Sequence, residues 1–391
     1  MAQDRLYELA FRYKKAKLWR RLWDSDVFAV RFSDGETGYC CVMGRAGEFN
    51  GMSVFVGDQA MNTFQELMDT DDPEAGLRQD CLQVKLTDSY DLMPEQEDEV
   101  RAYAKEHGIR FTGKNAFPAF VRMSPYHYPW PVMTAKEEAY LAEAMEAAIW
   151  LAEQLDTSGI TMNSLGFTTR GQKNEYTPLP LLTREDGAWR NEMLAQPEMR
   201  CYEAPAPVID DELSVRRLKK LIRPGSAWMA GVFLVPEAMQ VKAGDVPCYP
   251  HLLVVYDPEA DQLRHQELVA DYNQNARQTA ASFVQGLLEQ GVCPAQITVQ
   301  DLRSERLLAD LCLRAGITLE QAEVLPELNM IVNDMLHVML GGPETDNMDE
   351  LDDMDEETLR AQMERMLADH DSGRAPMPPE LAELLRRQLE K

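Results

Sequence analysis

The sequence predicts an α+β protein built from two duplicated domains and an acidic helical tail. Three observations support this fold class: a repeated order of helices and strands, an equal spacing of four aspartates, and a glycine that ends a helix at the same point of both halves. Each half is expected to contain a helix, three strands, a helix, a strand, a helix, a strand and a closing helix.

The repeat begins where a helix ends and a strand follows. The segments WRRLWDSDVFAV at 19–30 and LKKLIRPGSAWMAGVFLV at 218–235 share a basic helix end, a turn and an apolar run. Each is followed by two strands joined by a turn, at 38–58 in the first half and 250–271 in the second. The two halves therefore open with the same series of elements.

Four aspartates keep a constant spacing between the halves. Asp58 and Asp271 follow the paired strands, and we predict that each caps the next helix. Asp88 and Asp301 end the strands LQVKLTD and AQITVQD. Both pairs are 213 residues apart, so the segment between the two aspartates has the same length in each half. Equal length favours a duplication.

A glycine ends the helix that follows these strands. Gly108 and Gly316 suit the left-handed position after a helix, and in each half an isoleucine then opens a short strand. The closing helix of the first copy is expected at 134–155, because Thr134 and Glu137 form a capping-box pattern.

The repeat and the composition divide the chain into four parts. The second copy is expected to close with a helix at about 328–340, and a hairpin is expected around 176–182. The predicted parts are a first copy at 1–155, an irregular connector at 156–209, a second copy at 210–340, and an acidic linker with two amphipathic helices at 341–391.

Charge restricts the classes of partner. The chain has 66 acidic and 39 basic residues, a net charge of −27, and the acidity is densest in the tail. Binding to nucleic acid or to an anionic membrane depends on basic surface, so the composition argues against both. The longest apolar run, 227–235, is half the length of a membrane helix, and the first 25 residues lack a secretory signal. Seven cysteines without a CxxC pair favour a cytoplasmic location.

Two resemblances follow from these patterns. The runs YCCVMG…VFVGD at 39–58 and PAQITVQD…LRAGI at 294–317 resemble uncharacterised bacterial proteins built from paired domains of unknown function. This resemblance covers about residues 25–115 and 215–335 and implies no activity and no site residues. Three meandering strands followed by helix, strand, helix and strand also resemble the ribonuclease H-like topology, a likeness of fold alone.

Ribonuclease H-like enzymes hold two divalent metals with carboxylates, because Mg²⁺ prefers oxygen ligands and the paired metals flank the scissile phosphate. In the first copy the candidate catalytic ligands for Mg²⁺ are Asp34, Glu66 and Asp88, whereas in the second copy only Asp301 fits. The plainer interpretation is that such aspartates cap helices and close turns. Under this interpretation we expect no catalytic residue, no metal site and no cofactor.

The segment SPYHYPWP at 124–131 concentrates aromatic side chains between prolines. Tyr126, His127, Tyr128 and Trp130 could form a binding surface, because aromatic residues provide contact area at low entropic cost. Such a loop more often closes the end of a core. We keep these four residues as the candidate binding residues.

The sequence favours a non-enzymatic binding or scaffold module, since neither copy has a convincing catalytic set and a duplicated fold creates a groove between its copies. The alternative is a metal-dependent nuclease or phosphodiesterase that uses the first copy. The apolar stripes at 359–367 and 381–389 need a surface to fold against, either the basic N-terminal helix of the same chain or a protein partner. The long acidic tether before them favours a partner or a loosely attached tail. The basic helix around 12–21 is expected to cover a sheet with its charges facing acidic neighbours.

Overall fold

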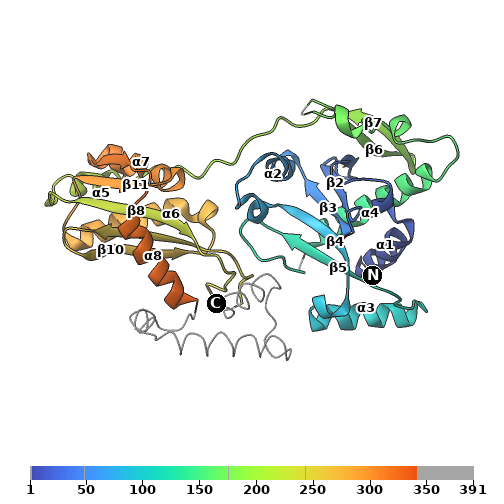
Figure 1. Ribbon diagram of the computed structural model, residues 1–391, viewed down its shortest axis with the longest axis horizontal. Helices are drawn as coiled ribbons and strands as arrows, with labels where there is room; N and C mark the ends of the chain where they lie inside the picture. The colour runs from blue at the N-terminus through green and yellow to red at the C-terminus, as the bar shows by residue number, and fades with distance from the viewer. Residues whose placement is uncertain (1, 48, 132, 175, 243, 341–391) are drawn as a thin grey trace, which may run out of the picture. The chain divides into compact units, whose positions relative to one another are not determined.

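The computed structural model describes residues 2–47, 49–131, 133–174, 176–242 and 244–340 (Figure 1). Residues Met1–Leu328 form one compact unit that contains two mixed sheets, and a second unit begins at Asn329. The predicted tail at 341–391, with its acidic linker and two amphipathic helices, lies outside the described residues.

The first half has the predicted order of helices and strands. Thr134 and Glu137 form the predicted capping box, in which each side chain accepts a hydrogen bond from the backbone N–H of the other. The elements are α1 (Ala2–Ala16), β1 (Phe28–Arg31), β2 (Thr37–Met43), β3 (Asn50–Val56), α2 (Asp58–Asp69), β4 (Cys81–Thr87), α3 (Pro94–Glu106), β5 (Phe117–Met123) and α4 (Ala135–Leu155).

The second half also has the predicted order. Asp271 and Asp301 are the N-caps of their helices, and Gly316 ends a helix in the left-handed conformation, as predicted. The elements are α5 (Glu212–Leu218), β8 (Ala227–Leu234), β9 (His251–Asp257), β10 (Gln262–Val269), α6 (Tyr272–Gln290), β11 (Gln296–Val299), α7 (Leu302–Ala315), β12 (Thr318–Gln321) and α8 (Pro326–Met339).

Two local predictions in the first half are wrong. The N-cap of α2 is Gly57, and Asp58 is the first helical residue, with its Oδ1 accepting a hydrogen bond of 2.6 Å from the Tyr39 hydroxyl. Gly108 does follow α3 with a positive φ, but Ile109 does not open a strand, because β5 begins only at Phe117.

The pairing of the strands contradicts the predicted duplication. The first sheet has the order β5-β4-β3-β2-β1-β6-β7, and the second has the order β10-β9-β8-β11-β12. In the first sheet β4 lies antiparallel beside β3, whereas in the second β11 lies parallel beside β8. The two halves are therefore not copies of one fold, and the prediction of a ribonuclease H-like first half is wrong.

The connections after α2 and α6 explain the difference. Helix α2 has 12 residues, and residues 70–80 then bring the chain back so that β4 runs opposite to β3. Helix α6 has 19 residues and is followed by residues 291–295, after which β11 runs parallel to β8. A crossover between parallel strands needs a connection of a dozen or more residues, which both halves have, so the return of the chain over residues 70–80 is what distinguishes the first half.

The stretch predicted as an irregular connector contributes two strands. A hairpin of β6 (Leu179–Glu185) and β7 (Ala188–Leu194) lies just after the predicted position, and β6 pairs parallel with β1. The hairpin thus extends the first sheet to seven strands. Residues 195–211 then join β7 to α5 without a helix or a strand.

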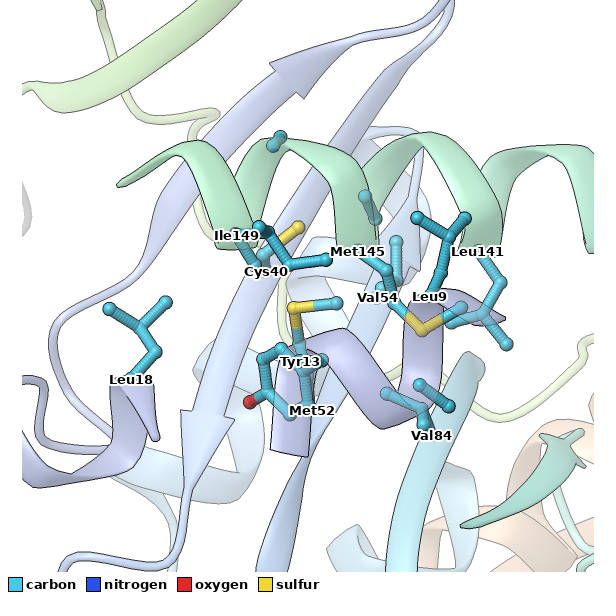
Figure 2. Packing of buried hydrophobic residues seen from close by; sticks show 14 of the residues in the cluster. Leu9, Tyr13, Leu18, Cys40, Met52, Val54, Val84, Leu141, Met145 and Ile149 are labelled. Atoms are coloured by element: carbon cyan, nitrogen blue, oxygen red, sulfur yellow. The ribbon is translucent and has the colours of Figure 1, made fainter. Parts of the chain in front are cut away.

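Helices α1 and α4 cover one face of the first sheet (Figure 2). Leu9 and Tyr13 of α1 and Met145 of α4 pack together over Met52 and Val54 of β3. Within the predicted basic stretch, Arg21 pairs with Asp156 at 2.8 Å and Arg12 lies 3.8 Å from Glu8, whereas Lys14 donates to the Ala116 carbonyl. This agrees with the predicted covering role of the basic helix.

The opposite face of the first sheet has its own cluster of buried side chains. Cys40 belongs to the cluster under α1 and α4, and Cys41 belongs to the second cluster, together with Met61 and Phe64 of α2. The adjacent cysteines therefore point to opposite faces, as the alternation along a strand predicts. Helix α2 lies on this second face, where the candidate site is found.

Candidate functional site

Helix α2 lines two different cavities with its two sides. We call the first the acidic cavity, which has a volume of about 670 Å³ and lies among α2, the segment 197–203 and the start of α6. Its charged lining residues are four carboxylates and two guanidinium groups: Asp58, Glu66, Glu198, Glu203, Arg78 and Arg200. The second cavity has mostly apolar walls and is described under the further inference.

The walls of the acidic cavity are rich in hydrogen-bond acceptors. Asn62 of α2 lines the cavity, and its buried Oδ1 has no hydrogen-bond partner within the described structure. A buried amide oxygen without a partner is unfavourable by about 1–3 kcal/mol, so a donor from a ligand would stabilise it. The cavity therefore suits a ligand that donates hydrogen bonds.

Arg78 forms the floor of this cavity and is 3% exposed. Its guanidinium donates to Glu66 Oε1 and to Asp72 Oδ2, both at 2.7 Å, and its Cζ lies 4.5 Å from the centre of the Tyr202 ring. Burial alone would lower the pKa of Arg78, but the hydrogen bonds, that with Glu66 first, raise it above its ordinary value. Its positive charge is consequently neutralised by the surrounding carboxylates.

A buried network continues from this floor into the second half of the chain. Glu74 accepts a hydrogen bond of 2.8 Å from the Tyr126 hydroxyl and forms an ion pair with Arg303 of α7. The Tyr202 hydroxyl donates to Asn273 of α6 at 2.7 Å. These contacts connect residues of both sheets within the compact unit.

Behind the network lies a buried imidazole. His251 is fully buried, and its ring is 4.8 Å from that of Tyr126 and 5.0 Å from that of Tyr272. The two ring nitrogens of His251 and the Tyr272 hydroxyl have no hydrogen-bond partner in the described part of the chain. Burial, followed by the charge of Arg303, lowers the pKa of His251 to about 3, so the ring is neutral at pH 7.

The predicted aromatic segment takes part in these contacts. Tyr126 is 1% exposed, has a φ of +57°, and its carbonyl accepts from the backbone N–H of Tyr249. The backbone of Tyr128 donates to Pro247. His127, Tyr128 and Trp130 line a separate open cavity of about 870 Å³. Tyr126 therefore lies within the packed interior, and the other three lie nearer the surface.

The three carboxylates of the nuclease alternative do not meet. Asp34 accepts hydrogen bonds from Tyr140 and from Lys136, and the bond from Tyr140, the stronger cause, lowers the pKa of Asp34 to about 2. Asp88 accepts from the backbone N–H of Asn115 at 2.7 Å. Of the three, Glu66 alone lines the acidic cavity, where it is paired with Arg78.

Metal ligands are likewise not gathered in the described residues, which contain no group of three or more His, Cys, Asp or Glu side chains able to hold an ion. Asp301 is engaged by Ser304, whose backbone N–H donates at 2.8 Å and whose hydroxyl donates at 2.6 Å. It therefore caps α7, as the plainer interpretation predicted. No helix in the described ranges combines the length and apolar character needed to cross a membrane.

Comparison with known protein families identifies both halves. Residues 4–170 match the Domain of unknown function (DUF7309), and residues 214–336 match the Domain of unknown function (DUF6930). The two halves of the chain are thus similar to two different domains of unknown function. No curated protein sequence matches it. Two different families agree with the two different strand orders, and the predicted resemblance to paired domains of unknown function is confirmed.

The acidic cavity combines residues from the DUF7309 and DUF6930 matches and from the stretch between them. Helix α2 belongs to the first match, Asn273 to the second, and Pro197 to Glu203 to the intervening segment. Sequence reasoning missed Asn62 and Arg78. The available signal for Arg78 was a lone arginine that follows Asp71, Asp72 and Glu74, because buried arginines need acidic partners.

Proposed function

We propose that the protein is a non-enzymatic binding module whose acidic cavity takes a positively charged ligand with N–H donors. The observation that carries this proposal is the unpartnered Asn62 Oδ1 in a cavity with more carboxylates than guanidinium groups. Glu66 and Glu203 are paired with Arg78 and Arg306, so an ammonium group would donate to Asn62 and to Asp58 or Glu198. Hydrogen bonds to charged groups are the stronger ones.

Electrostatics beyond the cavity supports the same ligand class. Arg78 is already paired with Glu66 and Asp72, so it offers little charge to an anion, and Glu198 is exposed on the connecting segment. The net charge of −27 raises the local concentration of cations. An anionic ligand would meet repulsion from both sources.

We also propose that the second domain is a ribonuclease H-like scaffold without catalytic carboxylates. A three-stranded meander, extended on the side of its first strand by two parallel strands, supports this topology. The Asp301 carboxylate accepts two hydrogen bonds from Ser304 and serves as a helix cap, which supports a scaffold role. A cytoplasmic location and a protein partner for the tail remain proposals from composition.

Calorimetric titration of the full chain with spermidine tests the binding proposal. We expect saturable binding, with no binding of heptane-1,7-diol, an uncharged chain of similar length. Asn62→Leu removes the unpartnered acceptor and should weaken spermidine binding about tenfold, since a hydrogen bond to a charged donor contributes about 1.5–3 kcal/mol. Glu198→Gln removes an exposed carboxylate and should weaken binding about threefold.

A matched variant distinguishes binding in the cavity from a general attraction of the cation to the negatively charged chain. Glu95→Gln changes the net charge by the same amount as Glu198→Gln, and Glu95 is exposed on α3, away from the cavity lining. It should leave spermidine affinity unchanged. Equal weakening by the two variants, or an absence of saturable binding to the full chain, would overturn the proposal.

A further inference from the structure

The other side of α2 lines a second cavity, which we call the apolar cavity. It has a volume of about 260 Å³ and lies within the first domain and the segment that follows it. Its apolar walls come from α2, from β6 and from the loops beside them: Val27, Met61, Phe64, Met68, Phe167, Leu179, Pro180 and Met199. The described linings of the two cavities share no residue, and the proposal for this cavity does not rest on the ligand proposed for the acidic cavity.

The walls of the apolar cavity are partly rigid and partly adaptable. Met61 and Phe64 are buried in the core cluster on this face of the sheet. Met68 and Met199 are 52% and 36% exposed, which places two flexible thioether side chains at the rim. Methionine adapts to the shape of a bound molecule, so the rim can close over a small ligand.

Two residues that line the cavity each have a buried polar atom without a hydrogen-bond partner in the described structure. The atoms are Gln65 Oε1 and Ser25 Oγ. The Gln65 amide nitrogen is already directed to Gln196 and to the Pro197 carbonyl, which leaves the oxygen as the free acceptor. Each unpartnered atom is unfavourable unless a donor is supplied.

Among the described residues that line the cavity there is one cation, Lys173, and its charge is neutralised. Lys173 forms an ion pair with Asp26, which is buried, and donates to the Ser25 carbonyl at 2.8 Å. A carboxylate or phosphate would therefore find no free positive charge among the described lining residues. Asp69, the exposed last residue of α2, also lines the cavity and repels anions, so the lining favours an uncharged ligand over an anionic one.

We propose that the apolar cavity binds a small neutral molecule with an apolar ring system and one N–H or O–H donor. The donor bonds to Gln65 Oε1, and the ring occupies the space between Phe64 and the methionines. A dry cavity of about 150 Å³ accommodates benzene, so the larger volume here suits a fused pair of rings.

The test compares indole with benzofuran, which has the same shape and lacks the N–H donor. Both are titrated into the full chain carrying ¹³C-methyl methionine, and the methyl signals are followed by NMR. Indole should bind and shift the signals of Met61, Met68 and Met199, with an affinity about fivefold above that of benzofuran, as one neutral hydrogen bond provides.

A pair of variants isolates the hydrogen bond. Gln65→Met keeps the side-chain volume and removes the acceptor, so it should weaken indole binding about fivefold and leave benzofuran binding unchanged. Gln262→Met, on the exposed start of β10, should change neither. Equal affinity of the native chain for the two probes, no saturable indole binding, or shifts confined to other methionines would overturn the proposal.

Discussion

The segments Asp58–Asp88 and Asp271–Asp301 have equal length and end in the same residue type, yet they build different structures. The first contains the 12-residue helix α2, a long return loop and β4, and the second contains the 19-residue helix α6, a short connection and β11. The return loop carries Glu74 and Arg78, which have no counterpart network in the second segment. Equal spacing therefore does not imply equal pairing of strands.

The two segments also differ in what their helices contribute to the proposed binding cavities. In the first domain α2 is short and amphipathic, and its two sides line the acidic and the apolar cavities. In the second domain α6 contributes Tyr272, Ala276, Phe283 and Leu287 to a packed core. The first segment lines both cavities, whereas the second contributes Asn273 at the start of α6 to the acidic cavity, so substitutions in the first segment should affect binding more.

The largest expected effect comes from breaking the Arg78 network. Arg78→Met leaves Glu66 and Asp72 without their buried partner, and removal of one member of a buried ion pair lowers the free energy of unfolding by about 3–5 kcal/mol. Arg277→Met in the second segment removes an exposed ion pair with Asp210 and should lower the free energy of unfolding by less than about 1 kcal/mol. Urea denaturation measures both, and similar losses would contradict the comparison.

The buried imidazole of His251 should make stability depend on pH. Its pKa is lowered from 6.5 to about 3, so the unfolded chain binds its proton first as pH falls. The stabilisation is therefore fully present above about pH 6.5 and is lost progressively towards pH 3, with a loss of about 2 kcal/mol at pH 5.

His251→Phe keeps an aromatic ring at this position and removes the titration. Denaturant unfolding at pH 7 and pH 5 should show about 2 kcal/mol less loss in the variant than in the native chain. The same pH dependence in both proteins would show that His251 is not the neutral buried group that the structure describes.

The cap positions provide a smaller contrast. Asp301→Ala should lower the free energy of unfolding by about 1.5 kcal/mol, because it removes a helix cap and leaves the buried Ser304 without two hydrogen bonds. Asp88→Ala should lower the free energy of unfolding by less, about 0.5–1 kcal/mol, because Asp88 caps no helix with its side chain and the variant loses the hydrogen bond from the Asn115 backbone N–H. Thermal unfolding of the two variants measures both losses, and equal losses of stability would contradict this prediction.

The smallest expected effect is a difference in how salt changes ligand affinity at the two cavities. At about 1 M salt the Debye length falls to about 3 Å, so spermidine binding should weaken several-fold while indole binding stays unchanged. Titration of the same full chain in low and high salt measures both. A strong salt dependence of indole binding would assign it to a charged site.

The order of the elements could be predicted from sequence because it depends on local patterns. The capping box at Thr134, the caps at Asp271 and Asp301, and the opposite faces of Cys40 and Cys41 all follow from spacing of a few residues. The partner of each strand depends on how far a helix carries the chain before it turns. A total length of 30 residues does not determine that distance.

The site was harder to predict for a related reason. Tyr126 was selected because it lies in an aromatic segment, and it does contact the buried network. Asn62 and Gln65 lie on a helix with an ordinary amphipathic pattern, and only the folded arrangement shows that their amide oxygens lack partners. Residues that matter because of a missing contact leave no pattern in the sequence.

Simultaneous titration of the ¹³C-methyl methionine protein with spermidine and indole tests the central claim most directly, that α2 separates two independent binding cavities. We predict that saturating spermidine leaves the affinity for indole and the shifts of Met61, Met68 and Met199 unchanged, with both ligands bound to one chain. Displacement of indole by spermidine, or identical methyl shifts for the two probes, would contradict the account.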